Sequence, residues 1–528
     1  MQSVSGKFIE RTNGAIRHLD WRLLASFLKV FDDDVDFFTI GVSAIGGTDI
    51  IKGSGSVVQE WDKYDYEDFS ARVLGFEWVR EADPPLGAVT LAMADITLDN
   101  SDDRFTPSNA LSPYYGHLGN GRPMRLYVGF QDTDKIQVFV GVTEGMPKID
   151  EANKTVKFHC IDFIRQLQNT ELNQTVMLTD SRTDEVISTV LQAGGLSTAQ
   201  FNLDVGSVVI PFAYFPKGTK IGTAIREITE AELGATYMDE NGVIRFENRT
   251  NWNSKSQSWE FTPRNTIDIS TPDESTVVNS VEVFSQARVV QAKQKLWEND
   301  GAVQFSDNSK ELPVGETKEV FIDFKDDYGD LPVTSADDPV YVTSATTSLF
   351  ATNVAEDGSS IAITGVTVVA TLFSTAMKLE FTNSGAGTCF ITQLEVWGTP
   401  AKVSQDIYEL VQDSDSIAEY EEHAIKIENN YIQDSTAAQS IAQLVISDRN
   451  EAEDERTLVV KGVPQLQIGD IVRYTDKKGN SNTYYIKKIS GKLNTDGLKQ
   501  TITIVKRTIN EYFRIGISAI GGDDLIAP

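Results

Sequence analysis

The sequence predicts a mainly β chain with a smaller α+β part: two small β-barrels flank an α+β unit, and a β-sandwich is inserted. Three observations favour this fold class. Apolar and polar residues alternate, as in β-strands, over much of residues 67–161 and 456–506. Helical spacing is confined to a few short segments. A compact run of β-branched residues at 341–397 is bounded by turn residues.

The chain begins with a lead-in, residues 1–66. Within it, the apolar residues of 14–31 are near helical spacing, which indicates a short amphipathic helix or an irregular segment. The first β-barrel domain is expected at 67–165, because five short strand patterns separated by turns make a small barrel or sandwich. These strands are expected at Ser70–Arg80, Ala88–Leu98, Met124–Gln131, Ile136–Glu144 and Thr155–Ile161.

An α+β domain is expected at 166–270, because helical spacing returns there and leads into a hairpin around Glu240-Asn241-Gly242. Its helices are expected at Asp184–Gln192 and Ile221–Leu233, and its hairpin strands at Ala235–Met238 and Val243–Glu247.

The second β-barrel domain is expected from two pieces, 271–332 and 401–511. The inserted β-sandwich at 333–400 separates them and starts at a polar joint, Pro332–Pro339. A helix at 434–449, capped by Asp434 or Ser435, is included in the second barrel domain. Its apolar face consists of Ala438, Ile441, Ala442 and Val445. Strands are expected at Ser275–Ala287, Arg456–Lys461, Ile471–Thr475, Thr483–Ser490 and Gln500–Lys506. A C-terminal arm, 512–528, follows.

The length of the chain favours a globular protein of several domains, because 528 residues are more than fold around a single hydrophobic core. A net charge of −30 argues against wrapping nucleic acid, although an acidic wall would let DNA pass as cargo. Cys160 and Cys389 are expected to be buried and reduced. Neither a secretory signal nor a membrane-spanning segment is expected, since no apolar stretch approaches eighteen residues.

A fourteen-residue phrase occurs twice, as FTIGVSAIGGTDII at 38–51 and as FRIGISAIGGDDLI at 513–526. Each copy alternates apolar and small residues and then reaches a Gly-Gly pair, like a strand before a tight turn. Two interpretations stay open. Each copy closes its own sheet, or both copies are arms that add as strands to grooves on a partner or on neighbouring subunits. The candidate interaction residues are Phe38, Ile40, Gly41, Ile45, Gly46, Gly47, Phe513, Ile515, Gly516, Ile520, Gly521 and Gly522.

No catalytic residue, cofactor or metal site is expected. The chain has neither a Cys-x-x-Cys nor a Gly-x-Ser-x-Gly motif, and no histidine pair has the i, i+4 spacing of a helical zinc site. His159 and Cys160 are adjacent in an expected strand, so their side chains point to opposite faces. The four histidines are His18, His117, His159 and His423.

The acidic segment after the second expected strand has the first alternating residues of a calcium loop, Asp99, Ser101 and Asp103. A calcium loop of that kind needs Gly at the sixth position and Glu at the twelfth, where this chain has Arg104 and Ala110. A turn that ends a strand explains the segment better.

Three passages resemble tail hub proteins of long-tailed bacteriophages, also called baseplate hub or tail-tip proteins. The first is ITLDNSDDRFTP at 96–107, continued by GRPMRL at 121–126. The second is MKLEFTNSGAGTCFITQLEVWGTP at 377–400. The third spans 414–472. It contains, in the family's order, Asp415-Ser416-Ile417, Asn429-Asn430-Tyr431-Ile432, the capped helix and Pro464-x-Leu466-x-x-Gly469-Asp470-x-Val472.

The resemblance implies a structural virion protein at the tail tip, made in the host cytoplasm, and not an enzyme. Three chains with two tube-type barrels each would form a pseudo-sixfold collar that joins a sixfold tail tube to a threefold tip and lets DNA pass. The implied partners are a distal tail ring protein, the tape measure protein and downstream tip or receptor-binding proteins. In the family, the Gly469-Asp470 pair shapes a barrel turn and is not catalytic.

Two other functions stay open. The insert could grip a cell-surface glycan with aromatic side chains, although their alternating strand positions favour a core role. These aromatics are Tyr341, Phe350, Phe373, Phe381, Phe390 and Trp397. A virion-associated hydrolase needs a pair of carboxylates at a defined separation, which a sequence does not contain.

Overall fold

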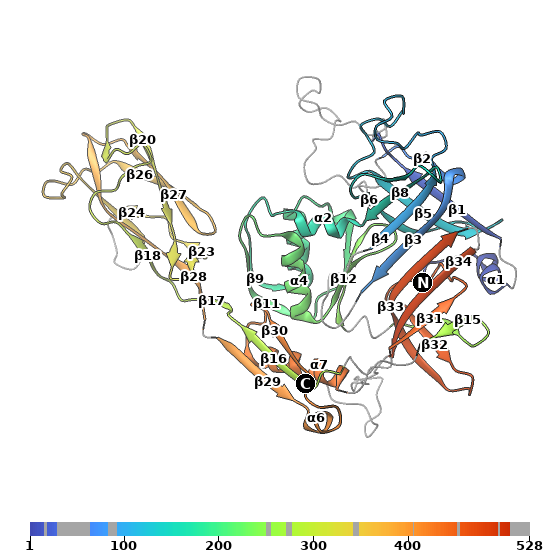
Figure 1. The fold of residues 1–528 in the computed structure, drawn as a ribbon. Coiled ribbons are helices and arrows are strands. Elements are labelled where there is room, and N and C mark those ends of the chain that lie inside the picture. The colour runs from blue at the N-terminus through green and yellow to red at the C-terminus, as the bar shows by residue number, and fades with distance from the viewer. Residues whose placement is uncertain are drawn as a thin grey trace.

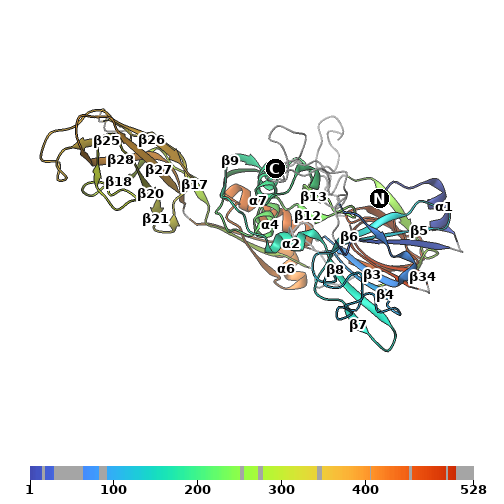
Figure 2. The same cartoon turned by 90° about the horizontal axis from the view of Figure 1, so that it is seen from above.

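The computed structural model describes residues 1–14, 18–28, 64–82, 92–249, 255–270, 277–341, 348–404, 406–450, 455–494 and 497–506. The described chain is mainly β, as predicted, and its helices gather in one part. Figures 1 and 2 show three parts in a row: a large curled sheet, a central α+β part and an elongated β insert at the far end.

Fourteen strands form the large sheet, whose main path runs β15-β31-β34-β33-β3-β4-β8-β6-β5-β1-β2. β14 and β32 pair with each other beside β33, and β7 pairs with β8. The strands from the N-terminal region are β1 (Leu19–Ala25), β2 (Glu67–Asp68), β3 (Val73–Glu81), β4 (Met93–Asp99), β5 (Pro123–Phe130), β6 (Ile136–Thr143), β7 (Lys148–Asp150) and β8 (Thr155–Ile161). The others are β14 (Gln257–Phe261), β15 (Thr266–Ile269), β31 (Glu455–Val460), β32 (Ile471–Thr475), β33 (Ser481–Asn494) and β34 (Gly497–Lys506).

The two regions predicted as separate barrels share this sheet. β3 pairs antiparallel with β33, from Phe76↔Leu493 to Glu81↔Lys488. Each region still buries its own apolar core, the first around Trp78 and the second around Ile486. Leu493, near the end of the long strand β33, packs in the first core. We call the two halves of the sheet the N-terminal lobe and the C-terminal lobe; β33 connects their cores.

Gly491 of β33 lies directly opposite Trp78, and a Cβ atom on Gly491 would be 2.1 Å from the buried indole ring. We therefore expect Gly491→Ala to lower the free energy of unfolding by about 2–3 kcal/mol, because the ring has no room to shift in a packed core. Gly6→Ala is the control, since nothing lies within 4 Å of a Cβ there. Chemical denaturation of both variants measures the difference, and equal stability would contradict this packing.

The lead-in differs from the prediction for residues 14–31. Residues Leu19–Ala25 form strand β1, which pairs along its whole length with β5, while the helix α1 (Gly6–Asn13) lies earlier. Leu23, Ala25 and Phe27 are all fully buried. Their spacing of two residues is the period of a β-strand. Other apolar residues of 14–31 also fit helical spacing, so the sequence did not distinguish the two.

The α+β part contains the predicted helices and hairpin. Its N-terminal elements are α2 (Phe163–Asn169), β9 (Val176–Arg182), α3 (Thr183–Ala193), β10 (Phe201–Leu203), β11 (Val209–Phe215), α4 (Ile221–Glu232), β12 (Ala235–Met238) and β13 (Ile244–Glu247). β10, β13 and β12 form one small sheet, and β9 pairs with β11.

The helix predicted at 434–449 is present as α7 (Ser435–Arg449), and the Asp434 side chain caps it through the Ala437 N–H. Its predicted place in the second barrel domain is wrong. α7 packs on β16 (Ser280–Ser285) and β29 (Ile407–Gln412), in the same apolar core as α3 and α4. The short helix α6 (Ser414–Tyr420) and β30 (Ala424–Glu428) complete this unit. The sheet order is β29-β16-β30.

The insert is longer than predicted. Strands between 288 and 323, assigned from the sequence to the second barrel, pair instead with β27 and β28. The expected joint at 332–339 contains strand β23, which also pairs with β28. The insert strands are β17 (Arg288–Val290), β18 (Gln294–Glu298), β19 (Glu311–Leu312), β20 (Thr317–Asp323), β21 (Lys325–Asp326), β22 (Gly329–Asp330), β23 (Val333–Ala336), β24 (Val340–Tyr341), β25 (Leu349–Asn353), β26 (Val366–Leu372), β27 (Ala376–Asn383) and β28 (Cys389–Val403).

Candidate interaction surfaces

The candidate interaction residues of the repeated phrase lie outside the described residues. Its first copy falls between the described segments 18–28 and 64–82, and its second copy follows Lys506, the last residue of β34. The residues concerned are Phe38, Ile40, Gly41, Ile45, Gly46, Gly47, Phe513, Ile515, Gly516, Ile520, Gly521 and Gly522.

A buried ion pair links the large sheet to the α+β part. Arg80 of β3 and Glu240 of the β12–β13 turn are each 5% exposed, and Arg80 Nη2 lies 3.5 Å from Glu240 Oε2. Arg80 Nη2 also donates to the Met238 carbonyl. Burial raises the pKa of the Glu240 carboxyl, and Arg80 opposes that rise. The pair is therefore a structural contact whose two charges depend on each other.

Hydrogen bonds extend this contact to three more segments. The Glu240 carbonyl accepts from Gln137 Nε2 of β6 (2.6 Å), and the Gln137 carbonyl accepts from Gln2 Nε2 (2.8 Å). The Gln2 N–H in turn donates to the carbonyl of the fully buried Gln465. These five residues, the polar junction, join both lobes of the sheet to the α+β part. Polar groups so placed hold the parts in one orientation, because a displaced partner would leave buried groups unpaired.

The Gly469-Asp470 pair forms a turn just before β32. Gly469 has a φ of 75°, a conformation that glycine adopts without strain. Asp470 Oδ2 accepts from the Gln467 N–H at 2.8 Å, and Asp470 Oδ1 accepts from the Met1 amino group. The carboxylate thus has structural partners on both oxygens, in line with the turn-shaping role that the resemblance implies.

Each of the three passages that resemble tail hub proteins contains a buried asparagine that closes a turn. Asn100 Oδ1 accepts from the Phe105 N–H, directly after β4. Asn383 Oδ1 accepts from the Gly385 N–H, and its Nδ2 donates to the Leu312 carbonyl. Asn429 Nδ2 donates to the Glu227 carbonyl of α4. Asparagine suits such sites because its amide mimics a backbone turn. These passages are folding motifs.

The cysteines and His159 have structural environments. Both cysteines are free and buried, as predicted, and burial raises the pKa of each thiol. His159 points to the opposite face from Cys160, where its Nδ1 lies 2.8 Å from Asp95 Oδ1. In the described segments, no group of three or more His, Cys, Asp and Glu side chains could hold a metal ion.

Glu230 of α4 is a partly buried carboxyl whose burial raises its pKa to about 7. Its charged form is disfavoured in the folded state, so it lowers stability increasingly as the pH rises from about 4.5 to 7. Glu230→Gln should therefore stabilise the protein by about 1–2 kcal/mol at pH 8, after allowance for solvent screening, and change little at pH 4. Thermal unfolding at both pH values tests this. The exposed Glu419→Gln on α6 is the control, and a pH-independent effect would contradict the assignment.

The insert aromatics divide into core and surface. Phe350 and Phe381 are buried and pack edge to face at 5.4 Å, as expected for a core role. Phe373 is about half exposed. Phe321, which the sequence did not single out, is exposed on the outer face of β20, opposite Lys378 of β27. The sequence held no signal for it, because Val320, Phe321 and Ile322 are three consecutive apolar residues.

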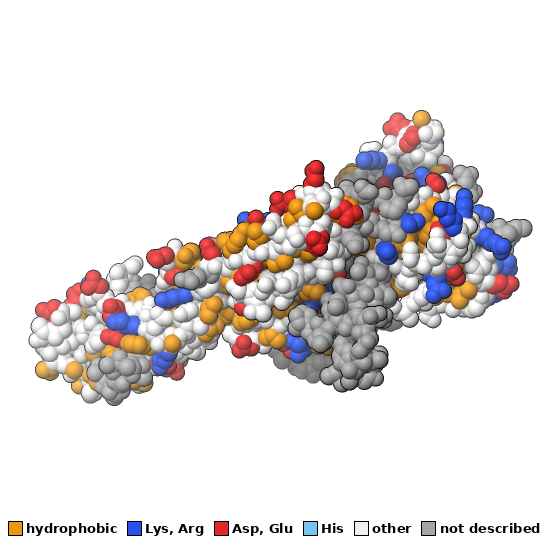
Figure 3. Space-filling model, turned by 90° about the horizontal axis from the view of Figure 1, so that it is seen from below, with side chains coloured by type: hydrophobic (Ala, Val, Ile, Leu, Met, Phe, Trp, Pro, Cys, Tyr) orange, Lys and Arg blue, Asp and Glu red, His pale blue; other side chains and the backbone are white. Residues whose placement is uncertain are grey.

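Charged side chains are unevenly distributed on the surface. On the face in Figure 3, carboxylates gather over the insert and the α+β part, while many of the Lys and Arg side chains lie over the large sheet at the right. On the outer face of that sheet, lysines pair with carboxylates of neighbouring strands, as in Lys488–Glu81 (2.8 Å) and Lys157–Asp95 (2.8 Å). Exposed pairs of this kind contribute little to stability.

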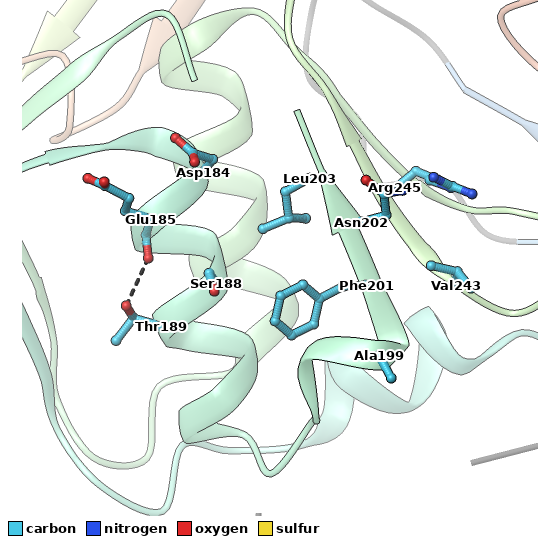
Figure 4. A pocket seen from close by; sticks show the side chains of 10 residues that line it. All are labelled: Asp184, Glu185, Ser188, Thr189, Ala199, Phe201, Asn202, Leu203, Val243 and Arg245. Atoms are coloured by element: carbon cyan, nitrogen blue, oxygen red, sulfur yellow. Dashed lines mark hydrogen bonds between the residues drawn. The ribbon is translucent and has the colours of Figure 1, made fainter. Parts of the chain in front are cut away.

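An open groove of about 710 Å³ lies between α3 and β10 (Figure 4). Ser188 and Thr189 line it from the helix, and Phe201 and Leu203 point toward the helix from the strand. Asn202, on the other face of β10, also lines it. The groove therefore follows the strand along its length.

None of the helices described here has the length and apolar character needed to cross a membrane.

No protein-family model and no curated protein matches the chain. Among solved structures, it is similar to the 43 kDa tail protein of prophage MuSo2 from Shewanella oneidensis, with 11% identity, a TM-score of 0.43 and coverage of 84% of this chain and 96% of that chain. It is similar to a tail protein from Neisseria meningitidis MC58, with 8% identity, a TM-score of 0.45 and coverage of 84% and 94%.

A third match is prophage tail protein gp18 from Listeria monocytogenes EGD-e, with 9% identity, a TM-score of 0.39 and coverage of 85% and 94%. All three structures are named tail proteins. At these TM-scores the likeness carries no argument on function, which rests on the residues described above.

Proposed function

We propose that the chain is a structural hub subunit of a bacteriophage tail tip. Three copies form a collar that joins the sixfold tail tube, or a distal ring on it, to the host-contacting tip and lets DNA pass. The chain acts through assembly contacts and not as an enzyme. Its place is the virion, and its partners are the distal ring protein, the tape measure protein and downstream tip or receptor-binding proteins.

The observation that carries this proposal is the pairing of β3 with β33, which joins two lobes with separate cores in one sheet. We take each lobe as one tube-type barrel of the collar. Three chains then supply six similar units, and a closed threefold ring needs only one kind of subunit interface. The polar junction supports this arrangement, because a collar needs its lobes held at a constant angle.

For the domain division, we propose a lead-in at 1–66, a first barrel at 67–165 and an α+β domain at 166–270, with a C-terminal arm at 512–528. For the remaining boundaries, we propose a division that follows the strand pairing. The insert extends over about 288–403, and residues 277–285 and 407–450 belong with the α+β core. The second barrel is then left with β14, β15 and β31–β34.

The two copies of the repeated phrase are proposed as assembly arms. An extended segment that adds to a sheet edge gains affinity from backbone hydrogen bonds, and its alternate side chains fill pockets. Ile40, Ile45, Ile515 and Ile520 would fill such pockets, while the glycines allow close backbone approach.

The purified chain should form a homotrimer. Native mass spectrometry and light scattering measure this directly, and the expected mass is three times that of the chain. The control is a variant with Tyr408→Ser on the central sheet, outside both lobes, which should keep the same mass. A chain that stays monomeric at the protein concentration at which tails assemble would overturn the proposed collar. A ring of six whole chains would overturn it as well.

A second candidate function is glycan binding by the insert. Exposed Phe321 and Phe373 favour it, since exposed aromatic rings can stack on sugars. Glycan-array binding that is lost in Phe321→Ser but kept in the control Val369→Ser, on the same outer sheet, would support this function. Binding to no glycan would remove it.

A further inference from the structure

Strand β26 is an unprotected edge of the insert. It ends the sheet β20-β27-β26, and in the described segments no strand pairs with its other edge. Edge strands can pair with another chain, and proteins usually prevent this with charged residues, proline or a β-bulge. β20, at the opposite edge, has Lys318, Glu319 and Asp323. β26 has the sequence VTVVATL, without charge or proline, and it pairs with β27 without a register shift.

The apolar core of the insert is incompletely covered along β26. On β20, at the other edge of the same sheet, both core-facing aliphatic side chains are buried. On β26, Val366 is buried at one end of the strand. The next three core-facing side chains, Val368, Ala370 and Leu372, pack against the same core but are only partly buried. A strand added beside β26 would remove this apolar surface from water and pair the open backbone groups.

The residue types of β26 follow the same order in both directions from Val369, so the strand is self-complementary. In an antiparallel pair of two such strands centred on Val369, the opposite residues are Val366–Leu372, Thr367–Thr371, Val368–Ala370 and Val369–Val369. Opposite residues share one face of a sheet, so the core-facing side chains meet one another and the exposed side chains do the same. A shift by one residue would place core-facing side chains against exposed ones.

We propose that β26 pairs antiparallel with β26 of a second copy of the chain, through a twofold axis at Val369. The two sheets then form one continuous sheet, with three strands from each copy. The absence of charge on β26 suits contact between like copies, because chains with a net charge of −30 repel each other where carboxylates meet. The insert lies at the far end of the molecule from the large sheet (Figures 1 and 2), so this contact leaves both lobes free.

This contact differs from the contacts within the proposed collar. A threefold ring has no twofold axis between its own chains, so pairs of β26 join chains of two separate rings. Single chains would pair through the same edge. The inference therefore goes beyond the collar and does not depend on it.

Analytical ultracentrifugation of the full chain over a concentration series tests the proposal. The mass of the parent should double between about 1 and 100 µM and return on dilution. Val369→Lys should raise the Kd of pairing at least about tenfold, because two like charges then lie opposite each other at the axis. The fold should be kept, since Val369 is 62% exposed. Thr317→Lys places the same charge at an exposed position of β20, the other edge, and this control should pair like the parent.

A charge exchange at the axis tests the register. Val369→Glu alone should also prevent pairing, whereas a mixture of Val369→Lys and Val369→Glu chains should regain the doubled mass, because opposite charges then face each other. A Val369→Lys variant that still pairs, or a mixture that does not, overturns the proposal. The mass at the lowest concentration tests the collar separately. Three chains that never become six overturn the pairing alone, one chain that becomes two overturns the collar alone, and a single chain at every concentration overturns both.

Discussion

Arg80→Met is expected to destabilise the protein by about 3–5 kcal/mol at pH 8, because it leaves the Glu240 carboxylate buried without its counter-charge. Burial already raises the pKa of Glu240, and the loss of Arg80 raises it further. The neutral form is then the favoured one in the folded state. The destabilisation should therefore shrink as the pH falls toward 5 and the carboxyl is protonated. Urea unfolding at pH 5 and pH 8 measures both effects.

Two further variants make this result specific. Adding Glu240→Gln to Arg80→Met should restore most of the stability at pH 8, since the unpaired charge is gone. Arg22→Met removes a partner of Asp68, and because both side chains are about half exposed it should cost at most about 1 kcal/mol. Equal losses in Arg80→Met and Arg22→Met, or a loss that does not depend on pH, would show that the polar junction does not join the parts.

Deletion of residues 512–528 is expected to leave the described fold intact and to abolish tail assembly. The described sheet is complete through Lys506 of β34, which already has β31 and β33 as partners. Circular dichroism and thermal unfolding of the truncated chain should match the parent, while electron microscopy of complemented particles should show no finished tails.

The point variants Ile515→Asp and Ile520→Asp provide the control for the deletion, because they keep the chain length and place a charge where an apolar pocket is expected. They should reproduce the assembly defect. A truncated chain that aggregates would show that the C-terminal copy is a strand of its own sheet. A truncated chain that folds and still assembles tails would remove the arm role altogether.

Local patterns predicted most strands and helices, and long-range partners explain the exceptions. β8 is at Thr155–Ile161 and β12 is at Ala235–Met238, as expected, because alternation or helical spacing is a local property. Strand partners are not local. Residues 317–323 were assigned from the sequence to the second barrel domain without a predicted strand, and the pairing of β20 with β27 puts them in the insert. Likewise, the face of α7 was predicted, but not the sheet that covers it.

The polar junction could not be found from the sequence. Arg80, Gln137, Glu240 and Gln465 are far apart in the chain, and no motif in the sequence links them. One signal was present: Phe76, Trp78 and Arg80 share one face of β3, so an arginine continues an apolar face and requires a buried partner. The identity of that partner depends on tertiary structure. The groove beside β10 had no signal, because an edge strand of three residues is too short for a periodic pattern.

The most direct test of the collar is a symmetry-resolved electron cryomicroscopy map of the ring formed by the purified chain. The account predicts threefold symmetry, with six lobes around a central opening, in which each chain contributes an N-terminal lobe and a C-terminal lobe joined through β3 and β33. A ring of six whole chains, or three chains whose lobes do not alternate around the axis, would contradict it.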